Sequence, residues 1–214
     1  MNRLTTLLLF GIFSLVLSSC AKEKNTYAVI ETGFGNMKVM LYNTTPKHRD
    51  NFIKLAKEGY YDSLLFHRVI SAFMIQGGDP DSRNAPPGAP LGMGGPGYQL
   101  DAEIGAPHLR GALAAARNNN PQKMSSGSQF YLVQGQKIDD NYLDETERRQ
   151  NIRYSPEQRK LYKEIGGTPF LDNDYTVFGE IVEGLDVLDK IAAVPTDASN
   201  RPLEDVRMKV RILE

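Results

Sequence analysis

The sequence predicts a mostly β domain, folded as a barrel or a sandwich. Eight β-rich runs follow one another along the chain, whereas amphipathic helix patterns are confined to two segments and a charged insertion. The 214 residues contain 41% hydrophobic and 24% charged side chains and no internal repeat. This composition is typical of one packed globular domain.

Charge and cysteine content exclude several functional classes. Lysine and arginine together number 25 and acidic residues 26, so the chain lacks the basic excess that nucleic-acid binding requires. The single cysteine, Cys20, allows neither an intrachain disulfide nor a thiolate-rich metal site, and the three histidines form no metal-binding motif. We therefore expect no nucleic-acid partner, no metal and no cofactor.

The first 20 residues have the pattern of a lipoprotein signal peptide. Arg3 precedes an apolar stretch at residues 4–17, which is short and contains polar residues, so a retained membrane anchor is the weaker interpretation. The end of this stretch, Leu17-Ser18-Ser19-Cys20, resembles the bacterial lipobox, in which the cysteine is lipidated. An ordinary cleavage site with an incidental thiol is the alternative.

These features divide the chain into three parts. We expect a signal peptide at residues 1–19, a lipidated tether at residues 20–26 and a folded domain at residues 27–214. A lipid on Cys20 would hold the domain at a membrane outside the cytoplasm, in the cell envelope.

The folded part begins with a predicted hairpin followed by a helix. Residues 27–32 and 37–42 are β-rich, and the glycines of residues 33–36 favour a turn between them. A helix is then expected to begin after Thr45, its N-cap, and to end at Gly59. The apolar residues of this segment share one helix face.

The remaining elements are mostly strands. Further β-rich runs predict strands at residues 66–76, 98–104, 111–116, 129–134, 175–181 and 206–213. One more helix is expected at residues 185–192, between Gly184 and Pro195.

Two segments interrupt this pattern. In residues 77–97, 12 of 21 are Gly or Pro, which predicts a long surface loop. Residues 92–97 match the letters of the dinucleotide-binding fingerprint but lack its preceding strand and following helix, so nucleotide binding is not expected. Residues 136–167 carry seven acidic and seven basic side chains and a capping box at Ser155. They predict a solvated helical insertion, for which a structural role is favoured over partner binding.

The run FHRVISAFMIQGGD at residues 66–79 is unusual for a strand. Arg68 and a glutamine lie among aromatic and thioether side chains. A bend or bulge would be needed to bring Phe73, Met74 and Gln76 alongside the arginine. Such a pocket would be apolar, with a few oriented donors and no titrating base. A core strand with Arg68 in a salt bridge is the alternative.

This run resembles the signature of the cyclophilin-type peptidyl-prolyl cis-trans isomerases. Two further matches follow in order: residues 111–116 and 128–131, GALAAA and SQFY, resemble the family's second signature, and residues 170–172 with 177–179, FLD and VFG, resemble its third. The resemblance implies a closed eight-stranded antiparallel barrel capped by two helices. It also implies an enzyme that accelerates rotation about X-Pro bonds without a covalent intermediate.

The resemblance assigns roles to individual residues. Arg68 matches the catalytic arginine, which suits donation of an N–H to the proline nitrogen as the amide loses its conjugation. Apolar groove residues would hold the proline ring, while Gln76 and backbone near Ala116 would anchor the flanking carbonyls. The implied substrate groove comprises Phe73, Met74, Gln76, Ala116, Arg117, Gln129, Tyr131, Phe170, Leu171 and Tyr175.

Five residues depart from the commonest family pattern. Ser71-Ala72 replaces Pro-Gly, Arg117 replaces Asn, Phe170 replaces Trp and Tyr175 replaces His. Because Phe170 has no indole N–H, weaker binding of the inhibitor cyclosporin is expected. Because no imidazole is expected in the groove, catalysis should be nearly flat between about pH 5.5 and 8.

Other polar and apolar residues have structural interpretations. His67 is expected to be a buried histidine with satisfied hydrogen bonds rather than a catalyst. Asp79 and Asp172 are expected to stabilise turns or loops, and Met93 is expected to contribute to packing.

These observations together predict a lipid-anchored, monomeric isomerase domain that binds proline-containing polypeptides and assists protein folding in the cell envelope. Two alternatives remain open. The first is a cyclophilin-fold peptide-binding or chaperone module with little turnover. The second is a scaffold whose insertion at residues 136–167 docks a partner.

Overall fold

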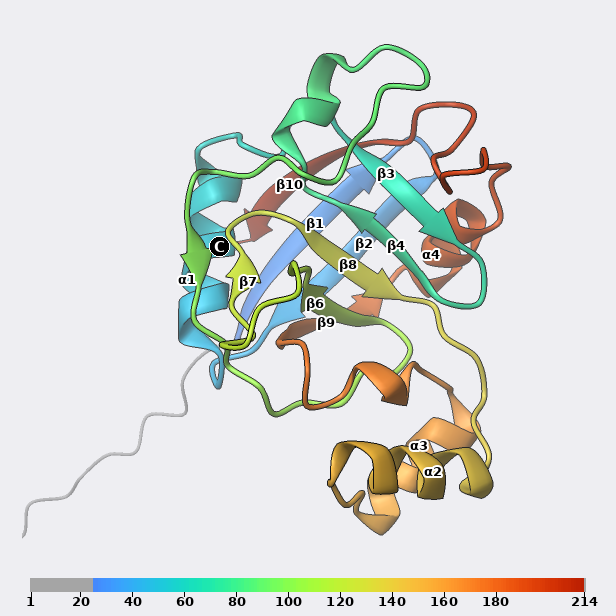
Figure 1. Cartoon of the computed structure of the whole chain (residues 1–214). Helices are drawn as coiled ribbons and strands as arrows, with labels where there is room; N and C mark the ends of the chain where they lie inside the picture. Colours follow the sequence, from blue (N-terminus) through green and yellow to red (C-terminus); the bar gives the residue numbers. More distant parts are fainter. Residues whose placement is uncertain (1–24, 214) are drawn as a thin grey trace, which may run out of the picture.

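The strands of this chain close on themselves, so that the sheet has no free edge. A computed structural model describes residues 25–213, and within this range eight strands form an antiparallel barrel in the order β1-β10-β3-β4-β8-β6-β9-β2 (Figure 1). The expected eight-stranded barrel is therefore confirmed. Cys20 and the expected signal peptide lie outside the described residues.

The elements have the following bounds. The barrel strands are β1 (Thr26–Thr32), β2 (Gly35–Leu41), β3 (Leu64–Ile70), β4 (Met74–Gly77), β6 (Ala112–Ala115), β8 (Phe130–Val133), β9 (Val177–Glu183) and β10 (Arg207–Leu213). Outside the barrel, β5 (Gln99–Leu100) pairs with β7 (Ser125–Ser126). The helices are α1 (Pro46–Lys57), α2 (Asp140–Gln150), α3 (Pro156–Glu164) and α4 (Leu185–Ala192), and the 3-10 turns are η1 (Pro80–Asn84) and η2 (Pro169–Leu171).

Two of the expected strands were wrong in detail. Residues 66–76 are not one strand but parts of β3 and β4, joined by a turn in which Ala72 has a φ of 60°. Residues 98–104 contribute only β5, because the segment that follows is held by side chains: Glu103 accepts a hydrogen bond from His48 at 2.7 Å. The number of barrel strands is still eight, because the expected strand at residues 66–76 forms two strands and the expected strand at residues 98–104 lies outside the barrel.

Helices α1 and α4 lie on opposite sides of the barrel and extend its core (Figure 1). Phe52 of α1 and Ile191 of α4 belong to the same buried cluster as Phe130 of β8, and the Phe52 and Phe130 rings meet edge to face at 5.6 Å. Thr45 precedes α1 as expected, but its hydroxyl donates to the Tyr42 carbonyl, so its role as a side-chain cap was wrong.

The barrel strands also carry a buried layer on their outer face. On β8, Phe130 points into the barrel core, whereas Tyr131 belongs to a separate outer cluster. On β6, Leu113 points inward, while Ala112 and Ala114 belong to the outer cluster. This division follows from the alternation of side chains along a strand. The small alanines leave room on the outer face, where the predicted groove residues gather.

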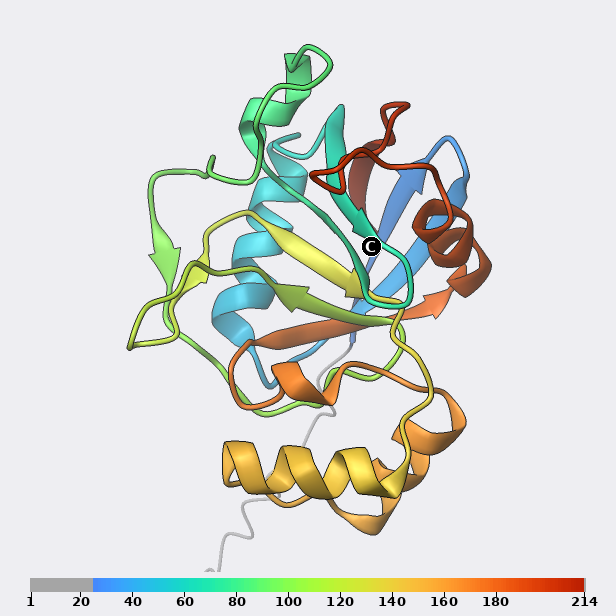
Figure 2. The ribbon, with the colours of Figure 1, turned by 45° about the vertical axis from the view of Figure 1, so that its right-hand side comes forward.

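The insertion is helical as expected, and it consists of two helices, α2 and α3, beside η2 at one end of the barrel (Figures 1 and 2). The predicted capping box at Ser155 is present, with reciprocal hydrogen bonds between Ser155 and Gln158. Leu143 and Tyr162 form a small core of their own. Within residues 25–213, no helix is both long and apolar enough to cross a membrane.

Candidate active site

The β3–β4 hairpin brings Arg68 and Gln76 side by side. The two residues are cross-strand partners, and Gln76 in turn pairs with Tyr131 on β8. A register shift between Phe66 and Arg68 and the tight turn at Ala72 supply the bend that the sequence required. The Arg68 side chain therefore lies on the outer face, next to the groove cluster.

A chain of amide groups orients the Arg68 guanidinium. The Gln129 side-chain nitrogen donates to the backbone carbonyls of Gly92 and Gly94, at 2.9 and 2.8 Å. Because carbonyls only accept, this fixes the Gln129 oxygen toward Gln76, which donates to it at 3.1 Å. The Gln76 oxygen then accepts from Arg68 Nη1 at 3.2 Å. The remaining N–H groups of the guanidinium stay available to a ligand.

The expected site residues converge on one small cavity. Nine of the eleven line a volume of about 110 Å³: Arg68, Phe73, Met74, Gln76, Ala116, Arg117, Tyr131, Leu171 and Tyr175. The other two lie beside it. Gln129 is buried in the amide chain, and Phe170 is 46% exposed at the rim, with its ring 5.4 Å from the Phe73 ring.

Aromatic rings form one wall of this cavity. The Tyr131 and Tyr175 rings meet edge to face at 6.0 Å, and the Arg117 guanidinium carbon lies 4.7 Å from the centre of the Tyr175 ring. Arg117 also donates to the Asp174 carbonyl at 2.8 Å. Burial raises the pKa of Tyr131 well above its ordinary value, so the Tyr131 hydroxyl stays protonated. The contact of the Arg117 guanidinium with the Tyr175 ring fixes the position of that ring.

The backbone of Ala116 is already engaged. Its N–H donates to the Gln129 carbonyl at 2.9 Å, and its carbonyl accepts from Ser126 at 2.7 Å. Ala116 thus holds β8 and β7 together at the edge of the cavity. Of the groups expected to anchor substrate carbonyls, the Gln76 amide lies on the cavity wall itself.

A second cavity of about 410 Å³ adjoins the first and was not predicted. It shares Gln76, Ala116 and Arg117 with the first, and the glycines of residues 92–97 line its other side. A Cβ at Gly94 would lie 2.2 Å from Asp79 Oδ1, so these glycines let the loop pack closely on that buried carboxylate. The high Gly/Pro content of this loop was the sequence signal that could have indicated the glycine-lined wall of the second cavity. Met93 is 83% exposed, so its expected packing role was wrong.

Three polar residues near the site differ from expectation. His67 is buried, but within residues 25–213 neither of its ring nitrogens has a hydrogen-bond partner, so the expected satisfied histidine was wrong. His108, which no motif contains, lies 2.9 Å from the Tyr131 hydroxyl. Its other ring nitrogen lies 2.7 Å from Asp172. Asp172 does stabilise its loop, and it also reaches the insertion through Tyr154 and Tyr162.

Comparison with known proteins agrees with this geometry. The family model of the cyclophilin-type peptidyl-prolyl cis-trans isomerases matches residues 27–211. A Staphylococcus aureus protein named as a peptidyl-prolyl cis-trans isomerase is 38% identical over 184 residues, which cover 83% of this chain and 86% of that protein. A Streptococcus pyogenes protein named as a bifunctional phosphatase and isomerase is 42% identical over 185 residues, 83% of this chain and 36% of that protein.

Solved structures show the same fold. The crystal structure of a Cryptosporidium parvum cyclophilin-type isomerase has a TM-score of 0.65 and 25% identity, covering 89% of this chain and 99% of that one. A structure of that protein in the presence of the dipeptide Ala-Pro has a TM-score of 0.63 and 26% identity, over 88% and 99% of the two chains. With its barrel, its groove residues and these relatives, the chain belongs to the cyclophilin-type peptidyl-prolyl cis-trans isomerase family.

Proposed function

We propose that the chain catalyses cis-trans isomerisation of X-Pro bonds in polypeptides, with Arg68 as the catalytic donor. The observation that carries this proposal is the placement of an oriented guanidinium, that of Arg68, on the wall of a cavity of about 110 Å³ that is also lined by apolar side chains. A proline ring suits the apolar walls of Phe73, Met74 and Leu171. The guanidinium then lies beside the ring nitrogen.

The proposed mechanism lowers the rotational barrier without breaking a bond. The X-Pro amide has partial double-bond character, and rotation removes it as the nitrogen becomes pyramidal and gains a lone pair. Arg68 remains charged and donates an N–H to that lone pair, so the interaction is stronger in the twisted state than in the planar one. Turnover of about 1000 per second would require roughly 6 to 7 kcal/mol of barrier reduction. One preorganised charge-assisted donor contributes about 3 to 4 kcal/mol, so orientation of the bound peptide in the cavity has to supply the rest.

A peptide assay tests this proposal. Isomerisation of an X-Pro peptide is followed with the wild-type chain and with Arg68→Ala, and circular dichroism establishes that both are folded. We expect rapid exchange with wild type and loss of most of it in the variant. A folded wild-type chain that binds proline peptides without accelerating exchange would instead be a peptide-binding module.

We propose further that the chain acts on clients in the cell envelope, held to a membrane by a lipid on Cys20. The lipobox-like Leu17-Ser18-Ser19-Cys20 supports this location. Mass spectrometry of the mature N-terminus and detergent partitioning of wild type and Cys20→Ser test it. Lipid mass on Cys20 and loss of membrane partitioning in the variant are expected. Equal partitioning of the two chains would contradict the anchor.

A further inference from the structure

A buried carboxylate joins the groove to the helical insertion. Asp172 follows η2, is 5% exposed, and accepts hydrogen bonds through both of its oxygens. On one side it receives the backbone N–H of His108 at 2.8 Å and the His108 ring nitrogen at 2.7 Å. On the other it receives the hydroxyl of Tyr154 at 2.8 Å and that of Tyr162. Four donors thus satisfy one carboxylate.

The acceptor character of Asp172 sets the direction of the remaining hydrogen bonds. An ionised carboxylate only accepts, so His108 Nδ1 carries the proton that it donates to Asp172. In the neutral imidazole, Nε2 is then the acceptor, and the Tyr131 hydroxyl donates to it over 2.9 Å. The His108 and Tyr131 rings lie nearly parallel, at 13°. The hydrogen-bonded path therefore ends on a residue of the proline cavity.

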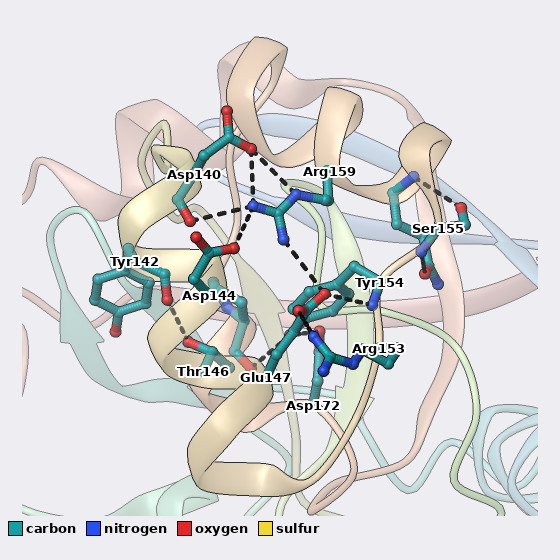
Figure 3. A network of polar contacts seen from close by, with 12 residues as sticks. Asp140, Tyr142, Asp144, Thr146, Glu147, Arg153, Tyr154, Ser155, Arg159 and Asp172 are labelled. Atoms are coloured by element: carbon teal, nitrogen blue, oxygen red, sulfur yellow. Dashed lines mark hydrogen bonds and ion pairs between the residues drawn. The ribbon is translucent and has the colours of Figure 1, made fainter.

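The insertion in turn fixes where its tyrosines lie. The Tyr154 backbone N–H donates to Glu147 Oε1 at 2.9 Å, and the same carboxylate pairs with Arg153 at 2.9 Å and Arg159 at 3.3 Å. Figure 3 shows Tyr154 close to both Glu147 and Asp172. Tyr162 is fully buried in the core of the insertion. Both hydroxyls that reach Asp172 are therefore supplied by residues held within the insertion.

We infer that Tyr154, Tyr162, Asp172 and His108 form a positioning relay that holds the Tyr131 ring against a bound proline, so that the insertion sets the efficiency of isomerisation from outside the groove. This inference rests on the proposed function. Tyr131 lines the proline cavity, and its hydroxyl is held from behind by the His108 ring nitrogen. Positioning of this kind changes turnover because small displacements of a binding wall misalign the reacting bond.

A double-mutant cycle separates positioning from simple stabilisation. The variants are Tyr131→Phe, the pair Tyr154→Phe with Tyr162→Phe, and all three changes together, in the full-length chain in detergent. Each removes hydroxyls and keeps the rings. The control is Tyr142→Phe, an exposed tyrosine on α2. Both kcat/KM for a peptide containing Ala-Pro and its Kd are measured, by exchange spectroscopy and titration.

The relay requires the losses to be non-additive. We expect Tyr131→Phe and the insertion pair each to lower kcat/KM about three- to tenfold, and the triple variant to be no worse than Tyr131→Phe. Tyr142→Phe should match wild type. If the pair lowers kcat/KM by the same factor with and without the Tyr131 hydroxyl, or not at all, the relay is overturned.

Two further outcomes are distinguishable. If the pair does not fold, Tyr154→Phe alone completes the same cycle, because it removes one donor from Asp172 and leaves the buried Tyr162 intact. If wild type binds the peptide but does not isomerise it, the proposed function fails. The double-mutant cycle is then evaluated from the Kd values. Non-additive losses of affinity support the relay, and additive losses overturn it.

Discussion

The groove and the insertion of this protein are held together by different forces. In the groove, neutral amides of Gln76 and Gln129 orient the Arg68 guanidinium, and apart from Arg117 the other walls are aromatic or aliphatic. In the insertion, the single side chain of Arg159 contacts three carboxylates: Asp140 at 3.0 Å, Asp144 at 2.7 Å and Glu147 at 3.3 Å. The groove thus depends on the exact placement of the Arg68 guanidinium, whereas the insertion carries many ion pairs.

This difference predicts how each region tolerates a substitution that keeps the charge. Ion pairs at a surface are individually weak and interchangeable, so the insertion should tolerate changes that keep its charge. In the groove, the donor must reach one developing lone pair, and another cation of different shape cannot replace it. The groove should therefore not tolerate a substitution that only keeps the charge. The same conservative replacement in the two regions therefore separates them.

The largest contrast is expected from Arg→Lys in each region. Arg68→Lys keeps the charge but loses the fixed fork of donors, and we expect kcat/KM to fall about 100-fold. Arg159→Lys should change kcat/KM less than about threefold and lower stability by about 1 kcal/mol. Peptide isomerisation and urea unfolding measure both effects. Equal losses of activity in the two variants would contradict the claim that only the groove requires the shape of the arginine side chain.

A second effect is expected on the stability of the insertion. Glu147 is 6% exposed and accepts from the Tyr154 N–H and two arginines. Glu147→Gln weakens the two ion pairs and should cost about 1 to 3 kcal/mol in free energy of unfolding. Glu145→Gln, at an exposed carboxylate on the same helix, is the matched control and should resemble wild type. An equal loss in both would show that the buried position of Glu147 is unimportant.

A smaller effect is expected at the turn of the hairpin. Ala72 has a φ of 60°, a left-handed conformation that costs energy for any residue with a Cβ. Ala72→Gly should therefore raise stability by about 0.5 to 1 kcal/mol, after the greater freedom of glycine in the unfolded chain is included. Ala85→Gly is the control, because Ala85 has a φ of −67° and should lose stability. Thermal unfolding of both variants measures the difference, and a loss at both positions would contradict strain at Ala72.

The smallest effect is expected in the pH dependence of catalysis, which should be nearly flat between about pH 5.5 and 8 because Arg68 does not titrate there. The insertion should respond at lower pH. The Tyr154 N–H and the neighbouring arginines lower the pKa of Glu147, so its contribution to stability is present above its unfolded pKa of about 4.5 and is lost as the pH falls.

Two measurements check this. Unfolding midpoints of wild type should drop more than those of Glu147→Gln as the pH falls below about 4.5. Rates of peptide isomerisation between about pH 5.5 and 8 should not change. A sharp step in rate near pH 6.5 would contradict the expectation.

The groove was predictable because its residues lie in three short motifs on adjacent strands. These motifs resemble the family's signatures, and Arg68, Gln76 and Tyr131 converge because Gln76 on β4 pairs with Arg68 on β3 and with Tyr131 on β8. The insertion was predictable as helices because Ser155 and Gln158 form a local capping box. Local signals of this kind survive folding unchanged.

The relay was not predictable, because its contacts are long-range. His108 and Asp172 are 64 positions apart in the sequence, and no periodicity links a loop histidine to a carboxylate after η2. The boundary between β3 and β4 was hidden for a similar reason, since Ala72 gives no glycine signal for its left-handed turn. Tyr154 and Tyr162, two aromatic residues in a strongly charged insertion, were a cue that the insertion is anchored to the barrel.

The most direct test of the account is exchange spectroscopy on a peptide containing Ala-Pro, which reports binding and rotation on the same sample. With wild type present in small amount, we expect exchange peaks between the cis and trans forms. With folded Arg68→Ala, we expect the peptide resonances still to shift but the exchange peaks to disappear. Exchange as fast with Arg68→Ala as with wild type would contradict the central role of this arginine.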